Sequence, residues 1–313
     1  MRNLLLLKKE MLPKIANFNA PKSKYSMNAF SRSWMITKLS FSVINKDREL
    51  LWFAVLSFIF SALFSVAMIF PSVIPTLMAD DFTSDSVQLF QYVIIFLTYF
   101  GLAFIATFFN VCVVHTTKVR FEGGNATFGQ SIRFALSKLN LIFQWSLLSA
   151  TVGLVLRILQ NLASNFGKVG QVVANILIGL VGMAWSIVSI FVVPVLVYEG
   201  LGPIDAVKKS TQIIKKTWGE SLIKSIGLGL VQFFVFVLII LASGALTFVL
   251  ASSFDVVGSL IGISVGVLLL LLTGLIFMVA STVFNTALYV YANNNLVASG
   301  FNEDVMRGAF KQK

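Results

Sequence analysis

The sequence predicts an all-α protein: a polytopic membrane helix bundle of six transmembrane helices, arranged as three repeated units of an amphipathic elbow helix plus a helical hairpin. Three observations lead to this prediction. Of 313 residues, 57% are hydrophobic and 12% are charged, against roughly 25% charged in soluble domains. The mean hydropathy is +0.88. The apolar residues gather in blocks long enough to cross a bilayer, and a related basic segment precedes alternate blocks.

Six stretches lack Asp, Glu, Lys and Arg, and each can hold a span of about 20 residues. The last stretch is long enough for two helices, but Asn293, Asn294 and Asn295 make its end too polar for a further lipid-exposed span. We therefore predict a cytoplasmic tail over 1–28 and another over 303–313, on either side of a membrane domain over 29–302. The predicted spans are 52–79, 88–115, 140–160, 171–197, 224–250 and 257–290.

The basic residues set the predicted orientation. All of the 24 Lys and Arg residues except Arg157 and Lys168 lie before the first span, in the even-numbered connections or in the C-terminal tail. Positive residues are retained on the cytoplasmic side, so both termini are expected in the cytosol. The net charge of +11 is spread over short segments with no motif that reads bases, which favours anionic membrane lipids over nucleic acid as the partner.

A repeat accompanies this basic pattern. Ser131–Leu147 is similar to Ala206–Leu222, 75 positions later, and Ala29–Leu51 is of the same type. The last copy has apolar residues at helical spacing opposite four lysines: Ile204, Val207, Thr211, Ile214 and Trp218. The second copy has a set with the same spacing: Phe128, Ile132, Ala135 and Leu139. This pattern is typical of a helix lying in the membrane interface; the alternative is a charged loop that only sets orientation. The expected lipid-interface residues are Trp34, Arg133, Lys138, Lys208, Lys209, Lys215, Lys216 and Trp218.

Gly258, Gly262 and Gly266 form a small-residue series in the sixth predicted span. Such a face lets two helix backbones approach closely. We expect it to pack inside the bundle, with a homodimer contact as the alternative.

Few residues suggest chemistry. Cys112 and His115 share a helix face, the minimum for a thiolate beside a base, but His115 is the one histidine in the chain and no third group is evident. Asp80, Asp81 and Asp85 could hold a divalent cation, although acidic outer loops are common without one. We predict no catalytic residue, no metal and no cofactor.

Polar residues inside the spans could line a solute path, or could serve helix packing through hydrogen bonds. The candidates are Arg157, Asn110, Gln144, Asn175, Gln232 and Asn285. An intramembrane charge suggests a functional site, but Arg157 lies near a helix end, from which it can reach the headgroups. Its expected partner, if it has one, is Asp255 or the Asp80 cluster.

Two short motifs carry a resemblance. Phe30-Ser-Arg-Ser-Trp34 followed by Asp47-Arg-Glu-Leu50, and later the run from Pro194 through Tyr198-Glu199-Gly200 to Trp218-Gly219, resemble a bacterial family of uncharacterised six-helix integral membrane proteins. The second motif is also distantly similar to the membrane domain of some glycerophosphodiester phosphodiesterases. The resemblance would cover the chain from about Phe30 onward. It implies a protein of the bacterial cytoplasmic (inner) membrane without an assigned reaction, and no phosphodiesterase domain is carried over.

Together these observations favour a non-enzymatic membrane protein that organises envelope lipids or partner proteins. The alternative is a transporter or permease for a small or lipidic solute, with Arg157 near the outer mouth of its path.

Overall fold

The computed structural model describes residues 29–77, 84–218 and 227–294, and these residues form helices and no strands. The predicted tails lie outside this description. The elements are α2 (Ala29–Lys46), α3 (Glu49–Leu77), α4 (Ser84–Phe121), α5 (Phe128–Ser137), α6 (Leu139–Ala163), the 3₁₀ turn η1 (Ser164–Phe166), α7 (Gly167–Val188), α8 (Val192–Glu199), α9 (Pro203–Trp218) and α10 (Gly227–Asn294).

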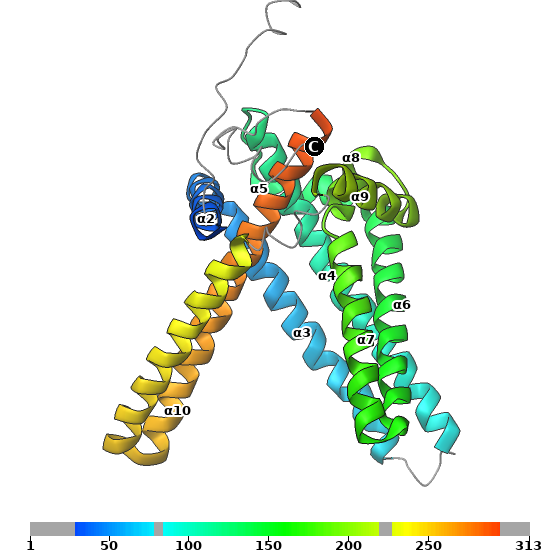
Figure 1. Ribbon diagram of the computed structural model, residues 1–313, viewed down its shortest axis with the longest axis vertical. Helices are drawn as coiled ribbons and strands as arrows, with labels where there is room; N and C mark the ends of the chain where they lie inside the picture. Colours follow the sequence, from blue (N-terminus) through cyan, green and yellow to red (C-terminus); the bar gives the residue numbers. More distant parts are fainter. Residues whose placement is uncertain (1–28, 78–83, 219–226, 295–313) are drawn as a thin grey trace, which may run out of the picture.

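The short helices gather at one end of the molecule. In Figure 1, α2, α5, α8 and α9 lie together at the top, and the long helices α3, α4, α6, α7 and α10 extend away from them. We call these the short-helix end and the far end. The α10 arm diverges from α6 and α7 toward the far end (Figure 1). The short helices therefore form a layer across one end of the long helices.

Five helical segments are long and apolar enough to cross a membrane: Glu49–Pro71, Leu89–Phe121, Leu139–Ala163, Gly167–Glu199 and Leu228–Val290. The last has 63 residues and is interrupted at Phe254 and Asp255, where Asp255 has a φ of 49°. A positive φ is uncommon for a residue other than glycine, and here it marks a turn. The chain reverses there, and the two halves of α10 run side by side (Figure 1).

The glycine series holds this hairpin together. A Cβ on Gly258 would collide with the backbone of Leu250, one on Gly262 would lie 2.5 Å from the Thr247 Cα, and one on Gly266 would lie 2.6 Å from the Ser243 Cβ. The three glycines thus face the first half of α10, inside the chain, as expected of a small-residue packing face.

The fourth predicted span, 171–197, lies within the apolar segment Gly167–Glu199, which the structure divides into two helices. Helix α7 ends at Val188, and α8 begins at Val192 after a turn. Pro194 lies in the first turn of α8, where a residue without a backbone N–H is tolerated. The Phe191 N–H, which the turn leaves outside a helical ladder, donates to the Ser210 hydroxyl at 3.2 Å. This apolar segment is therefore two helices joined by a turn.

The buried core lies at the short-helix end. Its largest fully buried side chains include Phe53 and Leu50 of α3, Phe191 before α8, and Leu288 of α10. Large apolar side chains elsewhere on the long helices are exposed, such as Phe70 at 81%. Such exposure suits hydrocarbon rather than water, because soluble monomers rarely expose contiguous apolar surface on this scale.

Candidate functional site

The short helices are fixed to the long ones by polar contacts, beginning at the α2–α3 junction. Asp47 lies between these helices and is only 6% exposed. Its carboxylate accepts from Arg120 Nε at 2.5 Å and also from Nη2, and Nη2 donates in addition to the Asn125 Oδ1 at 2.7 Å. Arg120 thus joins the first elbow, the end of α4 and the segment before α5. A bidentate guanidinium–carboxylate pair fixes geometry as well as charge.

Helix α5 is held against α4 by a second contact. The buried hydroxyls of Thr116 and Ser131 lie 2.6 Å apart, and Thr116 also donates to the Cys112 carbonyl at 3.0 Å. At the start of α5, Thr127 caps the helix, and the Gln130 side chain accepts from the Thr127 N–H at 2.8 Å. This capping box fixes where α5 begins.

An aromatic cluster forms at the same end from α4, α5 and α8. The His115 ring stacks on Phe134 with centroids 4.1 Å apart, and the Tyr198 hydroxyl lies 3.5 Å from His115 Nδ1. Lys118 Nζ lies 4.4 Å from the centre of the Tyr198 ring. Cys112 is fully buried, and no interaction among the described residues joins its sulfur to His115. The arrangement therefore gives no geometric support to a thiolate–base pair.

Glu199 connects three helices beside this cluster. Its Oε1 accepts from the Tyr289 hydroxyl of α10 at 3.1 Å, and its Oε2 lies 3.6 Å from Lys209 Nζ of α9. Gly200 follows with a φ of 67°, which ends α8 and turns the chain into α9. Glu199 and Gly200 belong to the motif that carries the family resemblance, and the structure gives both a role at the junction of α8, α9 and α10.

The third elbow packs on protein through part of the predicted apolar side and the face next to it. Ala206, Ser210 and Ile213 are buried together with Ile214 of the predicted apolar side, whereas Ile204 of that side is 62% exposed. The reason is that α8 lies against α9 and receives Ser210 at the Phe191 backbone. The exposed face of α9 carries Ile204 with Lys208 and Lys215.

The short-helix end presents a basic surface. We define the basic layer as the exposed cations of the short helices and their junctions: Lys38, Lys46, Arg48, Arg133, Lys208 and Lys215. In the described part of the chain, one of these six, Lys208, has an ion pair, with Asp205 at 2.9 Å. Trp34, on α2, is 58% exposed.

The other predicted interface residues are less exposed, or their side chains are not described. Lys138 is half-buried, 5.7 Å from the centre of the Phe134 ring, and Lys209 pairs with Glu199. The side chains of Lys216 and Trp218 lie outside the described residues.

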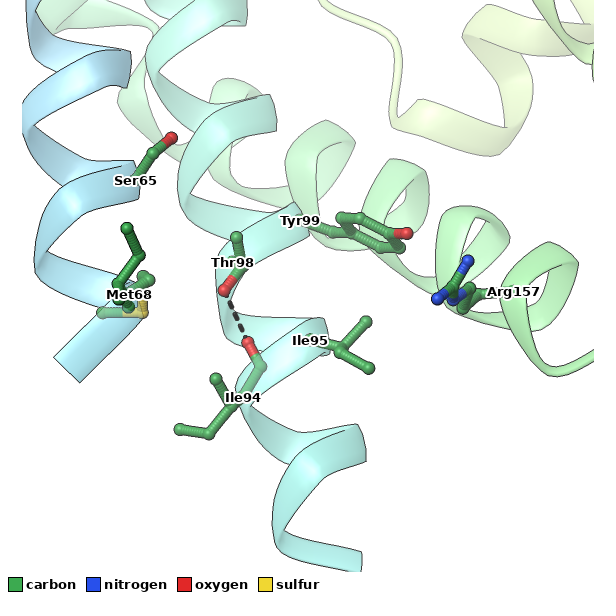
Figure 2. Close-up of a pocket in the computed structure, with 8 residues that line it drawn as sticks. Ser65, Met68, Ile94, Ile95, Thr98, Tyr99 and Arg157 are labelled. Atoms are coloured by element: carbon green, nitrogen blue, oxygen red, sulfur yellow. Dashed lines mark hydrogen bonds between the residues drawn. The ribbon is translucent and has the colours of Figure 1, made fainter. Parts of the chain in front are cut away.

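An open pocket of about 290 Å³ lies toward the far end, between α3, α4 and α6 (Figure 2). Arg157 is one of its lining residues, and the Tyr99 ring lies beside Arg157 in Figure 2. The hydroxyls of Ser65 and Thr98 each donate to a carbonyl of their own helix at 2.7 Å. The remaining lining side chains are Met68, Ile69, Ile94 and Ile95.

The other predicted path residues do not line this pocket. Gln144 donates to Asn140 Oδ1 at 3.2 Å within α6, and Asn175 is exposed on α7. Asn110 is half-buried on α4, and its Oδ1 has no partner among the described residues. Gln232 and Asn285 are half-buried on the two halves of α10.

Arg157 does not pair with the acidic residues proposed for it, as far as the structure describes them. Asp255 is exposed at the turn of the α10 arm, which Figure 1 places well away from α6. Asp80 and Asp81 lie outside the described residues, as does the side chain of Asp85.

Several helices long and apolar enough to cross a membrane, with the basic layer at one end, indicate a multi-pass helical membrane protein. Within this class, the chain belongs to the family of unknown function DUF6159, whose match covers residues 89–301. This confirms the expected membership of an uncharacterised family, although the match begins after α3 rather than near Phe30. A comparison with curated proteins gives no match.

Proposed function

We propose that this protein is a non-enzymatic, six-span protein of the bacterial inner membrane that organises lipids, or partner proteins, at the cytoplasmic face. The basic layer carries the proposal. It places six exposed cations at one end of an apolar bundle, and a Lys or Arg near an anionic membrane surface contributes about 1 kcal/mol each.

The fixed geometry of the short helices supports this role. Asp47–Arg120 and Thr116–Ser131 tie two elbows to α4, and Glu199 ties the third by contacting both Lys209 of α9 and Tyr289 of α10. The helices that carry the cations are therefore fixed at one end of the bundle, which lowers the entropy cost of binding a layer of headgroups. Trp34 adds an exposed indole of the kind that is enriched at membrane interfaces.

The proposed topology follows from the same features. Counting the two halves of α10 as separate spans gives six, so that both termini lie on the side of the basic layer. Each of α2, α5 and α9 precedes a long apolar helix in the chain, which supports three repeated units. Cytoplasmic placement rests on the distribution of Lys and Arg.

Reversal of charge on the exposed elbow faces tests the lipid role. The variant Arg133→Glu/Lys208→Glu/Lys215→Glu, reconstituted with spin-labelled phosphatidylglycerol and phosphatidylcholine, should lose its preference for the anionic lipid in the motionally restricted fraction. The matched control Arg133→Lys/Lys208→Arg/Lys215→Arg keeps every charge and should keep that preference. Equal preference in the two variants would refute association through this surface.

The alternative, a transporter for a small or lipidic solute, is favoured by the position of Arg157 in the far-end pocket. It has less support because the other five polar candidates are spread over α4, α6, α7 and α10. Solute uptake into proteoliposomes that is abolished by Arg157→Ala would favour transport over the organising role.

A further inference from the structure

The far-end pocket lies at a defined depth along the spans that form it. Arg157 is six residues before the end of α6 at Ala163, and Ser65 is twelve residues before the end of α3 at Leu77. At 1.5 Å per residue these two residues lie roughly 9 Å and roughly 18 Å from their helix ends. With the short-helix end in the cytosol, as proposed above, Arg157 therefore lies near the boundary between headgroups and hydrocarbon of the outer leaflet, and the α3 side of the pocket lies deeper in the hydrocarbon.

The inner part of the pocket suits a hydrocarbon chain. Met68 of α3 and Ile94 of α4 point toward each other in Figure 2, and Ile69 and Ile95 also line the pocket. The hydroxyls of Ser65 and Thr98 are engaged by their own helices, at 2.7 Å in both cases, and so offer their protons to no ligand. A volume of about 290 Å³ is at the lower limit for small-molecule sites, about 300 Å³. It fits a segment of one acyl chain better than a bulky solute.

The outer part of the pocket suits an anion. Arg157 is exposed, and no carboxylate in the described part of the chain pairs with it. A guanidinium presents a planar fork of donors that matches phosphate oxygens. The pocket therefore combines an apolar groove with a positive charge at its mouth.

Tyr99 adds a second donor at this mouth, and a glycine allows its position. A Cβ on Gly153, one helical turn before Arg157, would lie 3.1 Å from the Tyr99 Cδ2. The bare backbone at Gly153 thus lets the Tyr99 ring lie against α6, beside Arg157 (Figure 2). Its phenol is a hydrogen-bond donor suited to a headgroup oxygen.

We propose that this pocket binds one anionic phospholipid of the outer leaflet, with its phosphate on Arg157 and Tyr99 and an acyl chain between α3 and α4. The site is at the opposite end of the bundle from the basic layer. Its assignment to the outer leaflet rests on the orientation proposed above, whereas lipid binding in the pocket does not depend on the basic layer. It is also a resting site for lipid, which requires no passage through the bundle.

Native mass spectrometry of the delipidated protein, titrated with phosphatidylglycerol, tests the proposal. One lipid should bind the wild-type protein more tightly than the rest. Arg157→Gln should weaken that binding about tenfold or more, as expected from loss of a charged hydrogen bond. The matched control Lys168→Gln removes an exposed charge near the same end and should bind as wild type. Equal binding by the two variants would overturn the proposal.

A second variant tests the groove separately from the charge. Thr98→Trp would fill the space between α3 and α4 while leaving Arg157 in place. It should also weaken binding of the first lipid. Helical circular dichroism and monodisperse elution should match those of the wild type. Retention of the lipid at wild-type affinity in this folded variant would contradict seating of a chain in the groove.

Two further arms identify the ligand and separate the two proposals. Phosphatidylcholine should compete poorly for the first site, and glycerol 3-phosphate, which carries the phosphate without the chain, should not compete; effective competition by either would refute an anionic lipid. Arg133→Glu/Lys208→Glu/Lys215→Glu should leave this site intact. The pocket and the basic layer can therefore fail independently.

Discussion

The Asp47 carboxylate and the Arg120 guanidinium form a two-pronged ion pair between residues 73 positions apart. Asp47 is 6% exposed and the Arg120 side chain is 27% exposed. The pair joins two parts of the short-helix end, because Asp47 lies at the α2–α3 junction and Arg120 lies in the last turn of α4.

This asymmetry in burial predicts unequal costs for removing either partner. Arg120→Ala would leave a buried, unpaired carboxylate and should lower stability by about 3 kcal/mol, near the lower limit for breaking a buried pair. Asp47→Ala leaves a cation that can reach water and should cost less, about 1–2 kcal/mol. Thermal unfolding in detergent measures both. Arg48→Ala, at an exposed neighbouring position, should change stability by under about 0.5 kcal/mol.

A double-mutant cycle tests whether the two residues are coupled. Asp47→Ala/Arg120→Ala should be no less stable than Arg120→Ala alone, because the orphaned charge is gone. Strict additivity of the two single effects would show that the pair is not coupled.

The hydroxyl pair that anchors α5 predicts a similar rescue. Thr116→Val would leave the fully buried Ser131 hydroxyl without its 2.6 Å partner and should cost about 1–3 kcal/mol in thermal unfolding. Adding Ser131→Ala should recover part of this loss, because no buried polar group is then left unsatisfied. If the double variant is less stable than Thr116→Val, the contact is not what holds Ser131.

The α10 hairpin predicts a contrast between two glycines. Gly262→Ala would place a Cβ 2.5 Å from the Thr247 Cα, and the resulting overpacking should cost about 1–3 kcal/mol. Gly244→Ala meets nothing within 4 Å and should be neutral or stabilising by up to about 1 kcal/mol, because alanine favours the helix. Equal unfolding temperatures for the two variants would show that the halves do not pack through this face.

Local signals in the sequence predicted much of this architecture. Long apolar stretches indicate membrane helices because each span must satisfy its backbone hydrogen bonds within itself. The basic, amphipathic segments indicated α2, α5 and α9, and the spacing of Gly258, Gly262 and Gly266 indicated a close helix contact. All of these depend on residues within one helix or its neighbour.

The polar junctions could not be predicted in the same way. Tyr289 and Glu199 are 90 positions apart, and Tyr198 and His115 are 83 apart, so no local periodicity relates them. The buried face of α9 depends on where α8 lies, so the burial of Ala206 and Ser210 does not follow from helical spacing alone. Glu199 was marked by its motif alone, with no indication of its partners.

The central claim of this account is that the short-helix end faces the cytosol. Single cysteines in a Cys112→Ala background report the two sides of the membrane. One replaces Lys215, on the exposed face of α9, and the other replaces Lys168, at the start of α7 and at the far end of the molecule. A membrane-impermeant thiol reagent applied to intact cells should label Lys168→Cys and not Lys215→Cys. In inverted membrane vesicles the same reagent should label Lys215→Cys and not Lys168→Cys. Labelling of Lys215→Cys from outside intact cells would contradict the orientation, and with it the role proposed for the basic layer.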